Sequence, residues 1–203
     1  MCHLRLVSDG WAEAPETSRR KAVELARQAL NATSDDPGVL VNAAFVLARF
    51  GEDIGAMTGL VDRALALNPS FARGWILSGY VRLYAGESDL AIEHVENSLR
   101  LNPRERMGAP LTLIGEAYFF QRRFGEAASK LLLSIQDNPG HPLAYRTLAA
   151  CYAHMGRLDE ARDVVERLRA ITPLVVPNAN YLRNPEQREL FLSGLRLAAG
   201  EAT

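Results

Sequence analysis

Apolar and small residues recur along the chain at helical spacing, in segments that come in pairs. Four similar endings, ALNP, RLNP, QDNP and AITP, place prolines at positions 69, 103, 139 and 173, which are 34, 36 and 34 residues apart. The alternation of apolar and polar residues that is typical of a strand does not occur between them. Each interval instead predicts two amphipathic helices separated by a short break, so the chain is expected to be all-helical and repetitive.

The last interval shows the pattern most clearly. One face of its first predicted helix carries Tyr145, Leu148, Ala149 and Tyr152, which are spaced i, i+3, i+4 and i+7. Gly156 ends this helix, because glycine accepts the positive φ that a helix C-terminus often needs. The acidic pair at 159–160 suits the positive N-terminal end of a second helix, and Pro173 closes the unit because proline lacks the N–H for the next helical hydrogen bond.

The periodicity divides the chain into three parts. Residues 1–33 are expected to form a partial N-terminal repeat, since one helix over 19–33 has little sequence before it to supply a partner. The chain is then expected to begin inside a repeat, either as a fragment of a longer protein or because its true start lies upstream. Residues 34–173 are expected to form four helix pairs. Residues 174–203 are expected to form a linker lying over the last pair and a C-terminal capping helix with Asn184 as N-cap, Pro185 first in the helix, and Gln187 completing a capping box.

The repeated pattern resembles the tetratricopeptide repeat (TPR) family, whose units are helix-turn-helix repeats of about 34 residues. The fourth unit matches it through Tyr145, Leu148, Ala149, Tyr152, Gly156, Leu158, Ala161 and Pro173. The chain departs from it at Arg122, which replaces the turn glycine, and at Ser78 and Arg82, where large apolar residues are usual. The resemblance implies an all-α fold of the TPR type, a right-handed solenoid or superhelix of antiparallel helix pairs with a C-terminal capping helix.

Composition excludes several function classes. Charged residues make up 23% of the chain and hydrophobic residues 48%, with a formal net charge of −1, so nothing attracts nucleic acid or anionic lipid in bulk. No apolar stretch approaches the roughly 20 residues that cross a bilayer. Two cysteines, Cys2 and Cys151, make no disulfide framework and fit a reducing compartment. We expect a cytoplasmic protein, and the sequence specifies no oligomeric state.

Candidate chemistry is sparse. Cys151 and His154 are three residues apart and could share a helix face, but a zinc site needs about four ligands, or three and a water. A small buried thiol beside a groove-facing histidine is the simpler interpretation. Glu116 is a single carboxylate without a second acid placed to share proton transfer, and no glycine-rich phosphate loop is present. We therefore predict no catalytic residue, no metal and no cofactor, and hence no enzyme in this segment.

The resemblance also implies a binding surface. In the family, the first helix of each pair lines a concave face between the packing positions. Carried over residue by residue, this predicts a peptide- or protein-binding groove of Val41, Phe45, Arg49, Arg73, Ile76, Tyr80, Tyr84, Glu116, Phe119, Phe120, Arg146 and His154. Aromatic residues and arginines are the usual anchors of interfaces, although several of these rings could instead be half-buried between helices.

The predicted ligand is an apolar or amphipathic segment. Members of the family that hold a terminal carboxylate use Lys and Asn at positions that here carry Val41, Phe45, Ile76 and Tyr80, so the resemblance argues against such a clamp. The ligand could also be another part of the same polypeptide.

A narrower resemblance covers nearly the whole chain. The stretches starting NPSFARGW, YAHMGRLD and NPEQRELF are similar to the C-terminal TPR region of bacterial class III adenylate/guanylate cyclases. This likeness implies a regulatory or scaffolding segment of a cyclic-nucleotide signalling enzyme. Two alternatives stay open: a free-standing adaptor in another pathway, or a product named for a cyclase activity whose catalytic domain is absent from this chain.

Overall fold

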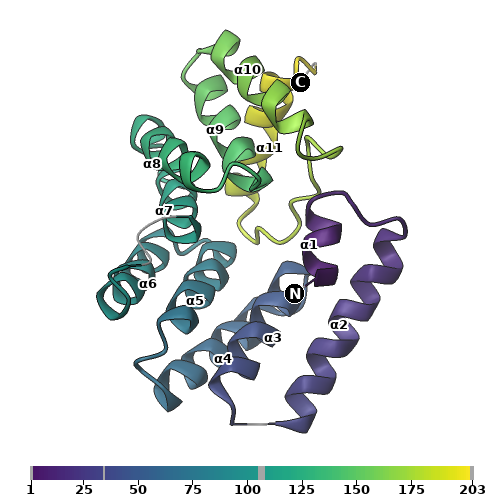
Figure 1. Ribbon diagram of the computed structural model, residues 1–203, viewed down its shortest axis with the longest axis vertical. Coiled ribbons are helices and arrows are strands. Elements are labelled where there is room, and N and C mark those ends of the chain that lie inside the picture. Colours follow the sequence, from purple (N-terminus) through teal and green to yellow (C-terminus); the bar gives the residue numbers. More distant parts are fainter. Residues whose placement is uncertain (1, 34, 105–107, 202–203) are drawn as a thin grey trace. The chain divides into compact units, whose positions relative to one another are not determined.

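The computed structural model describes residues 2–33, 35–104 and 108–201, and within these residues all regular structure is helical. The helices, drawn in Figure 1, are α1 (Cys2–Ser8), α2 (Pro15–Ala32), α3 (Pro37–Arg49), α4 (Ile54–Leu67), α5 (Ala72–Ala85), α6 (Ser88–Leu101), α7 (Ala109–Phe120), α8 (Phe124–Asp137), α9 (Pro142–His154), α10 (Leu158–Arg169) and α11 (Pro185–Ala199). The all-helical TPR-type fold class predicted from the sequence is confirmed.

The chain forms two compact units. Unit 1 comprises residues 1–104 together with Asn180–Arg183, and unit 2 comprises residues 105–179 and 184–203. In unit 1, α3 packs on α4 and α5 on α6, while α2 packs on α3 and both α3 and α4 pack on α5. In unit 2, α7 packs on α8 and α9 on α10, with α8 against α9. Within each unit, every helix thus contacts its sequence neighbours of that unit, as in a solenoid.

Small residues allow the helices within each unit to approach closely. Ala44, Ala64, Ala127 and Ala161 have no solvent exposure. At Gly115 in α7, an added Cβ would lie 2.7 Å from Cγ of Leu131 in α8, well inside ordinary contact. The alternation of small and large residues in the sequence therefore sets the spacing within the helix pairs.

Local sequence signals account for helix ends. The side chain of Asn184 accepts hydrogen bonds from the backbone N–H groups of Glu186 and Gln187, at 2.9 and 3.2 Å, which confirms the predicted N-cap. Gly156 follows α9 with φ of 74°, as expected for a helix-ending glycine. Arg122, which replaces the corresponding glycine after α7, has φ of 60° and is the one non-glycine residue with positive φ among those described. The turn geometry is thus kept without glycine.

Helix α11 packs mainly on α9 and also contacts α10. It buries Leu190, Phe191, Leu195 and Ala198. The apolar surface of the last helix pair in unit 2 is therefore covered by a helix from the same unit, as a terminal capping element requires.

Candidate functional site

The first helices of the pairs, α3 and α5 in unit 1 and α7 and α9 in unit 2, carry all twelve residues predicted to line a groove. We call their surface the A-helix face and describe it within each unit. Val41, Phe45, Ile76, Tyr80 and Tyr84 are buried in unit 1, and Glu116, Phe119 and Arg146 are buried in unit 2. Arg49, Phe120 and His154 are half-buried, and Arg73 is exposed with Nη2 at 3.4 Å from the Asn42 side-chain oxygen. The A-helix face is therefore largely covered by other parts of the chain.

An aromatic cluster lies on the A-helix face of unit 1. The ring centroid of Phe45 is 5.6 Å from that of Tyr80 and 6.1 Å from that of Tyr84, and the two tyrosine rings are 6.3 Å apart. The ring of Tyr181, far along the chain, meets Tyr84 edge-on with centroids 4.9 Å apart. Such stacked, tilted and edge-on pairs are favourable beyond the area they bury.

Two arginines complete this cluster. The Arg49 guanidinium carbon lies 3.5 Å above the centroid of the Tyr181 ring, a cation–π contact. Nη2 of Arg183 donates to the backbone carbonyls of Ala48, at 3.0 Å, and Glu52, at 2.8 Å. The backbone N–H of Arg183 donates to the carbonyl of Tyr84 at 2.9 Å. The four residues Asn180–Arg183, which we call the NYLR segment, are thus held by side chains and main chain of α3, α5 and the turn after α3.

In unit 2, α11 covers the part of the A-helix face that carries Phe119 and His154. The ring of Phe119 lies 5.9 Å from His154 and 6.3 Å from Phe191 of α11, and His154 also stacks on Phe124 at 5.2 Å. Nε2 of His154 is 2.7 Å from the backbone carbonyl of Leu190, to which it donates. This part of the predicted surface therefore belongs to an internal helix interface.

Arg146 of α9 is also engaged internally. It is 1% exposed, and its guanidinium donates to the backbone carbonyls of Leu174 and of Val175, the latter at 3.2 Å. These hydrogen bonds hold the chain after α10 against α9. Residues 174–175 thus lie against α9 in unit 2, whereas the NYLR segment belongs to unit 1.

The geometry does not form a chemical centre around Cys151. Its side chain has no solvent exposure, and burial raises the pKa of the thiol. Nε2 of His154 donates its hydrogen bond to the Leu190 carbonyl. Within residues 2–33, 35–104 and 108–201, no group of three or more His, Cys, Asp or Glu side chains is placed to hold a metal. The Cys151–His154 pair is accounted for by helix packing.

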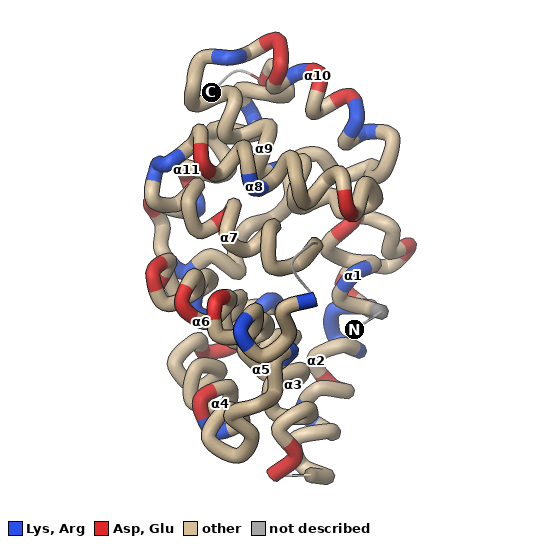
Figure 2. Tube along the Cα trace, turned by 60° about the vertical axis from the view of Figure 1, so that its left-hand side comes forward, with Lys and Arg blue, Asp and Glu red and all other residues tan. Residues whose placement is uncertain are grey.

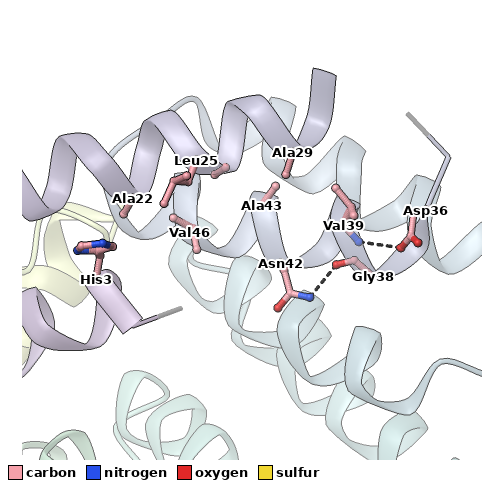
Figure 3. Close-up of a pocket in the computed structure, with 11 residues that line it drawn as sticks. His3, Ala22, Leu25, Ala29, Asp36, Gly38, Val39, Asn42, Ala43 and Val46 are labelled. Atoms are coloured by element: carbon pink, nitrogen blue, oxygen red, sulfur yellow. Dashed lines mark hydrogen bonds between the residues drawn. The ribbon is translucent and has the colours of Figure 1, made fainter. Parts of the chain in front are cut away.

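A pocket of about 370 Å³ lies among α1, α2 and α3 of unit 1 (Figure 3). Its lining consists of His3, Ala22, Leu25, Ala26, Ala29, Asp36, Gly38, Val39, Asn42, Ala43 and Val46, and includes no predicted groove residue. Two of its polar side chains form hydrogen bonds with the backbone at the start of α3. Asp36 accepts from the Val39 N–H at 2.9 Å, and Asn42 donates to the Gly38 carbonyl at 2.7 Å. The pocket is mainly an apolar gap beside a short α1.

Charges are interspersed over the helices, as Figure 2 shows, and many form local ion pairs such as Arg123 with Glu126 and Arg157 with Glu160. Their hydrogen-bonded partners raise the pKa of both arginines and lower the pKa of both glutamates. Mixed surface charge of this kind favours solubility over steering of a polyanion. None of the described helices has the length and hydropathy to span a bilayer.

Sequence reasoning missed Tyr181 and Arg183. The segment VPNANYLRN has no helical or strand periodicity, and the contacts that Tyr181 and Arg183 make with α3, α5 and the turn after α3 are with residues more than 90 positions away. One weak signal was present: in unit 1 the predicted surface had two arginines at its edges and three aromatic rings, a receptor suited to an aromatic and polar segment.

Comparisons with known proteins agree with the fold. A family model described as a tetratricopeptide repeat matches residues 118–183, about a third of the chain. A search of curated proteins found no match. The narrower likeness to cyclase repeat regions is not supported by these comparisons, whereas the TPR character is.

Solved structures with the same fold cover most of the chain. The thermophilic TPR protein TTC0263 of Thermus thermophilus is 22% identical, with a TM-score of 0.66 over 96% of this chain and 97% of that one. YrrB, described as a TPR protein with an unusual peptide-binding site, is 22% identical, with a TM-score of 0.53 over 88% and 92%. MamA of Desulfovibrio magneticus RS-1 is 19% identical, with a TM-score of 0.56 over 84% and 90%. These likenesses show that the chain has the fold of TPR proteins.

Proposed function

We propose that this chain, a protein-interaction module with the fold of TPR proteins, binds a polypeptide segment of its partner on the A-helix face of unit 1. One observation carries the proposal. That face holds a stretch of polypeptide without helix or strand, the NYLR segment, through a backbone hydrogen bond from Arg183 to Tyr84 and through the side chains of Tyr181 and Arg183. A surface that holds one such segment has the geometry to hold another.

The chemistry of the face supports a peptide ligand. Aromatic rings provide rigid contact area at low entropic cost, and an arginine stacked on a ring provides orientation. Helix ends provide backbone carbonyls that accept hydrogen bonds from any donor of suitable reach. The NYLR segment is the intramolecular ligand in this proposal, and an external segment binds when it replaces it.

The face in unit 2 is the weaker candidate. There helix α11 covers Phe119 and His154, and Arg146 donates hydrogen bonds to backbone carbonyls of the loop after α10. Removing a helix exposes more apolar surface than releasing four residues, and the cost grows with the area exposed. The proposal therefore places the binding site in unit 1.

Two further elements complete the proposal. Association with a nucleotide cyclase rests on the sequence likeness of the stretches named above, and a free-standing adaptor fits the fold equally well. A cytoplasmic location is supported by the buried free thiol of Cys151, which suits a reducing compartment.

The test is selection of peptides from a displayed random library on the chain that carries Tyr181→Ala and Arg183→Ala, which disable the tethered NYLR segment, followed by affinity measurement on that chain with either of two further substitutions. Arg49→Ala removes the guanidinium above Tyr181 on the proposed face. Arg123→Ala is the matched control, because it removes a guanidinium 4.1 Å above another ring, Tyr118, in unit 2. We expect selected peptides to lose affinity for Arg49→Ala and to keep it for Arg123→Ala. Peptides that bind all three proteins equally, or a library that yields no binder, would contradict the proposed site.

A further inference from the structure

The NYLR segment presents two side chains, two positions apart, to two different receptors. The Tyr181 ring is 3% exposed; the Arg49 guanidinium covers its face at 3.5 Å, and Tyr84 meets it edge-on at 66°. An aliphatic side chain has neither the electron-rich face that attracts the guanidinium nor the edge that suits Tyr84. The first receptor is therefore specific for an aromatic ring.

The second receptor is specific for a guanidinium. Nη2 of Arg183 donates to two carbonyls of the receptor, those of Ala48 and Glu52, and Nη1 donates to the carbonyl of Asn180, within the segment itself, at 2.7 Å. The first two acceptors lie at and just beyond the end of α3, where the helix dipole favours a cation. Lysine could supply the charge, but it lacks the planar fork of donors that reaches all three carbonyls from one side chain.

The main chain sets the register between the two receptors. The Arg183 N–H donates to the Tyr84 carbonyl, at the end of α5, at 2.9 Å. This contact does not depend on the side chain, so it would hold any segment in the same frame. With the main chain held there, the ring reaches Arg49 and Tyr84 from two positions before the arginine.

We infer that the partner of this site is a segment without helix or strand that carries an aromatic residue, any residue, and then arginine, and that it binds by replacing the NYLR segment. This inference rests on the proposed function and names the chemistry of its ligand. Release of the segment requires no helix to unfold, because residues 172–184 between α10 and α11 contain neither helix nor strand. Local opening of this kind costs less than global unfolding.

The strength of the competition between the tethered NYLR segment and an external peptide can be estimated. A tethered segment acts at an effective concentration on the order of millimolar. An external peptide with the same contacts must therefore reach that range to compete with the wild-type chain, and it binds far more readily once the internal copy is disabled.

The experiment uses the full-length chain and a fluorescent peptide of sequence NANYLRN, residues 178–184, with binding followed by anisotropy. In the protein, the double variant Tyr181→Ala/Arg183→Ala disables the internal copy and leaves its receptors intact. The control peptides replace the tyrosine by alanine, the arginine by alanine, or the arginine by lysine. A second protein adds Arg49→Ala to the double variant, so that one receptor is removed.

We expect the double variant to bind NANYLRN at least about ten-fold more tightly than the wild-type chain does, because the tethered competitor is gone. Each alanine peptide should bind at least about ten-fold more weakly, and the lysine peptide should be weaker than NANYLRN, because a charge-assisted hydrogen bond is lost in each arginine replacement. Adding Arg49→Ala should abolish the preference for the aromatic peptide. A folded double variant that binds all four peptides equally, or none, would overturn the inference.

A second measurement tests the inference if the double variant does not fold. Hydrogen exchange of the Arg183 amide is measured in the wild-type chain with and without millimolar NANYLRN, and with a scrambled peptide as control. Displacement predicts faster exchange of that amide with NANYLRN alone, and an unchanged rate contradicts the inference. The two proposals can fail separately: library peptides that depend on Arg49 but lack the aromatic-x-arginine signature would keep the proposed function and reject this ligand.

Discussion

Helices α11 and α9 approach so closely at Gly194 that a substitution adding one methyl group, Gly194→Ala, tests their contact. A Cβ at position 194 would lie 2.7 Å from Nε2 of His154 and 2.9 Å from the Cβ of Ala150. Ordinary contacts between carbon atoms are about 3.5–4.0 Å. The histidine ring could turn only by giving up its hydrogen bond to the Leu190 carbonyl, and the alanine Cβ cannot move without its helix. Gly194→Ala therefore has to displace α11.

The expected cost follows from two opposing contributions. Alanine favours a helix interior by about 1 kcal/mol over glycine. Overpacking costs about 1–3 kcal/mol, and a contact against a backbone-attached methyl belongs near the upper end of that range. We expect Gly194→Ala to lower the free energy of unfolding by about 2 kcal/mol. Gly125→Ala is the matched control in the same unit, since a Cβ there meets nothing within 4 Å and should be neutral or stabilising by up to about 1 kcal/mol.

The assay is urea denaturation of the wild-type chain and both variants. Far-UV circular dichroism follows the helices of both units, whereas fluorescence follows unit 1, because both tryptophans, Trp11 and Trp75, lie there. We expect the lower free energy of unfolding of Gly194→Ala to shift the urea transition followed by circular dichroism to lower urea concentration. If Gly194→Ala is as stable as Gly125→Ala, α11 does not dock on α9 as described.

Three further outcomes are expected. Burial and the nearby Arg82 lower the pKa of His94 below its ordinary 6.5, so the unfolded chain binds a proton at higher pH than the folded chain does, and the free energy of unfolding should be full above about pH 6.5 and fall below it. Urea titrations at about pH 8 and pH 5 should show a smaller fall in the free energy of unfolding for His94→Gln than for the wild-type chain; equal falls would contradict the lowered pKa. Arg122→Gly should stabilise by about 0.5–1 kcal/mol in the same titrations, because it relieves a left-handed conformation; a loss would speak against that turn. Cys151 should resist iodoacetamide in the native chain and react in urea, mapped by mass spectrometry; fast native alkylation would contradict its burial.

The sequence alone determined the helices and their turns. The prolines ending each unit, Gly156 and the Asn184 cap act within about one helical turn of their own position, so their effect can be read without a partner. The small residues at helix contacts were equally readable, because their 3.6-residue period shows which face they share. The helical class and the paired arrangement follow from such local interactions.

Only the tertiary structure decided what covers the A-helix face. The Arg183 side chain contacts carbonyls 131 and 135 residues earlier in the chain, a pairing that no local pattern encodes. Likewise, Arg146 could be recognised as an arginine on a helix, but its acceptors at Leu174 and Val175 depend on the path of the following loop. Side chains at helical spacing predict a face, whereas the occupant of that face depends on contacts between distant residues, which exist only once the chain has folded.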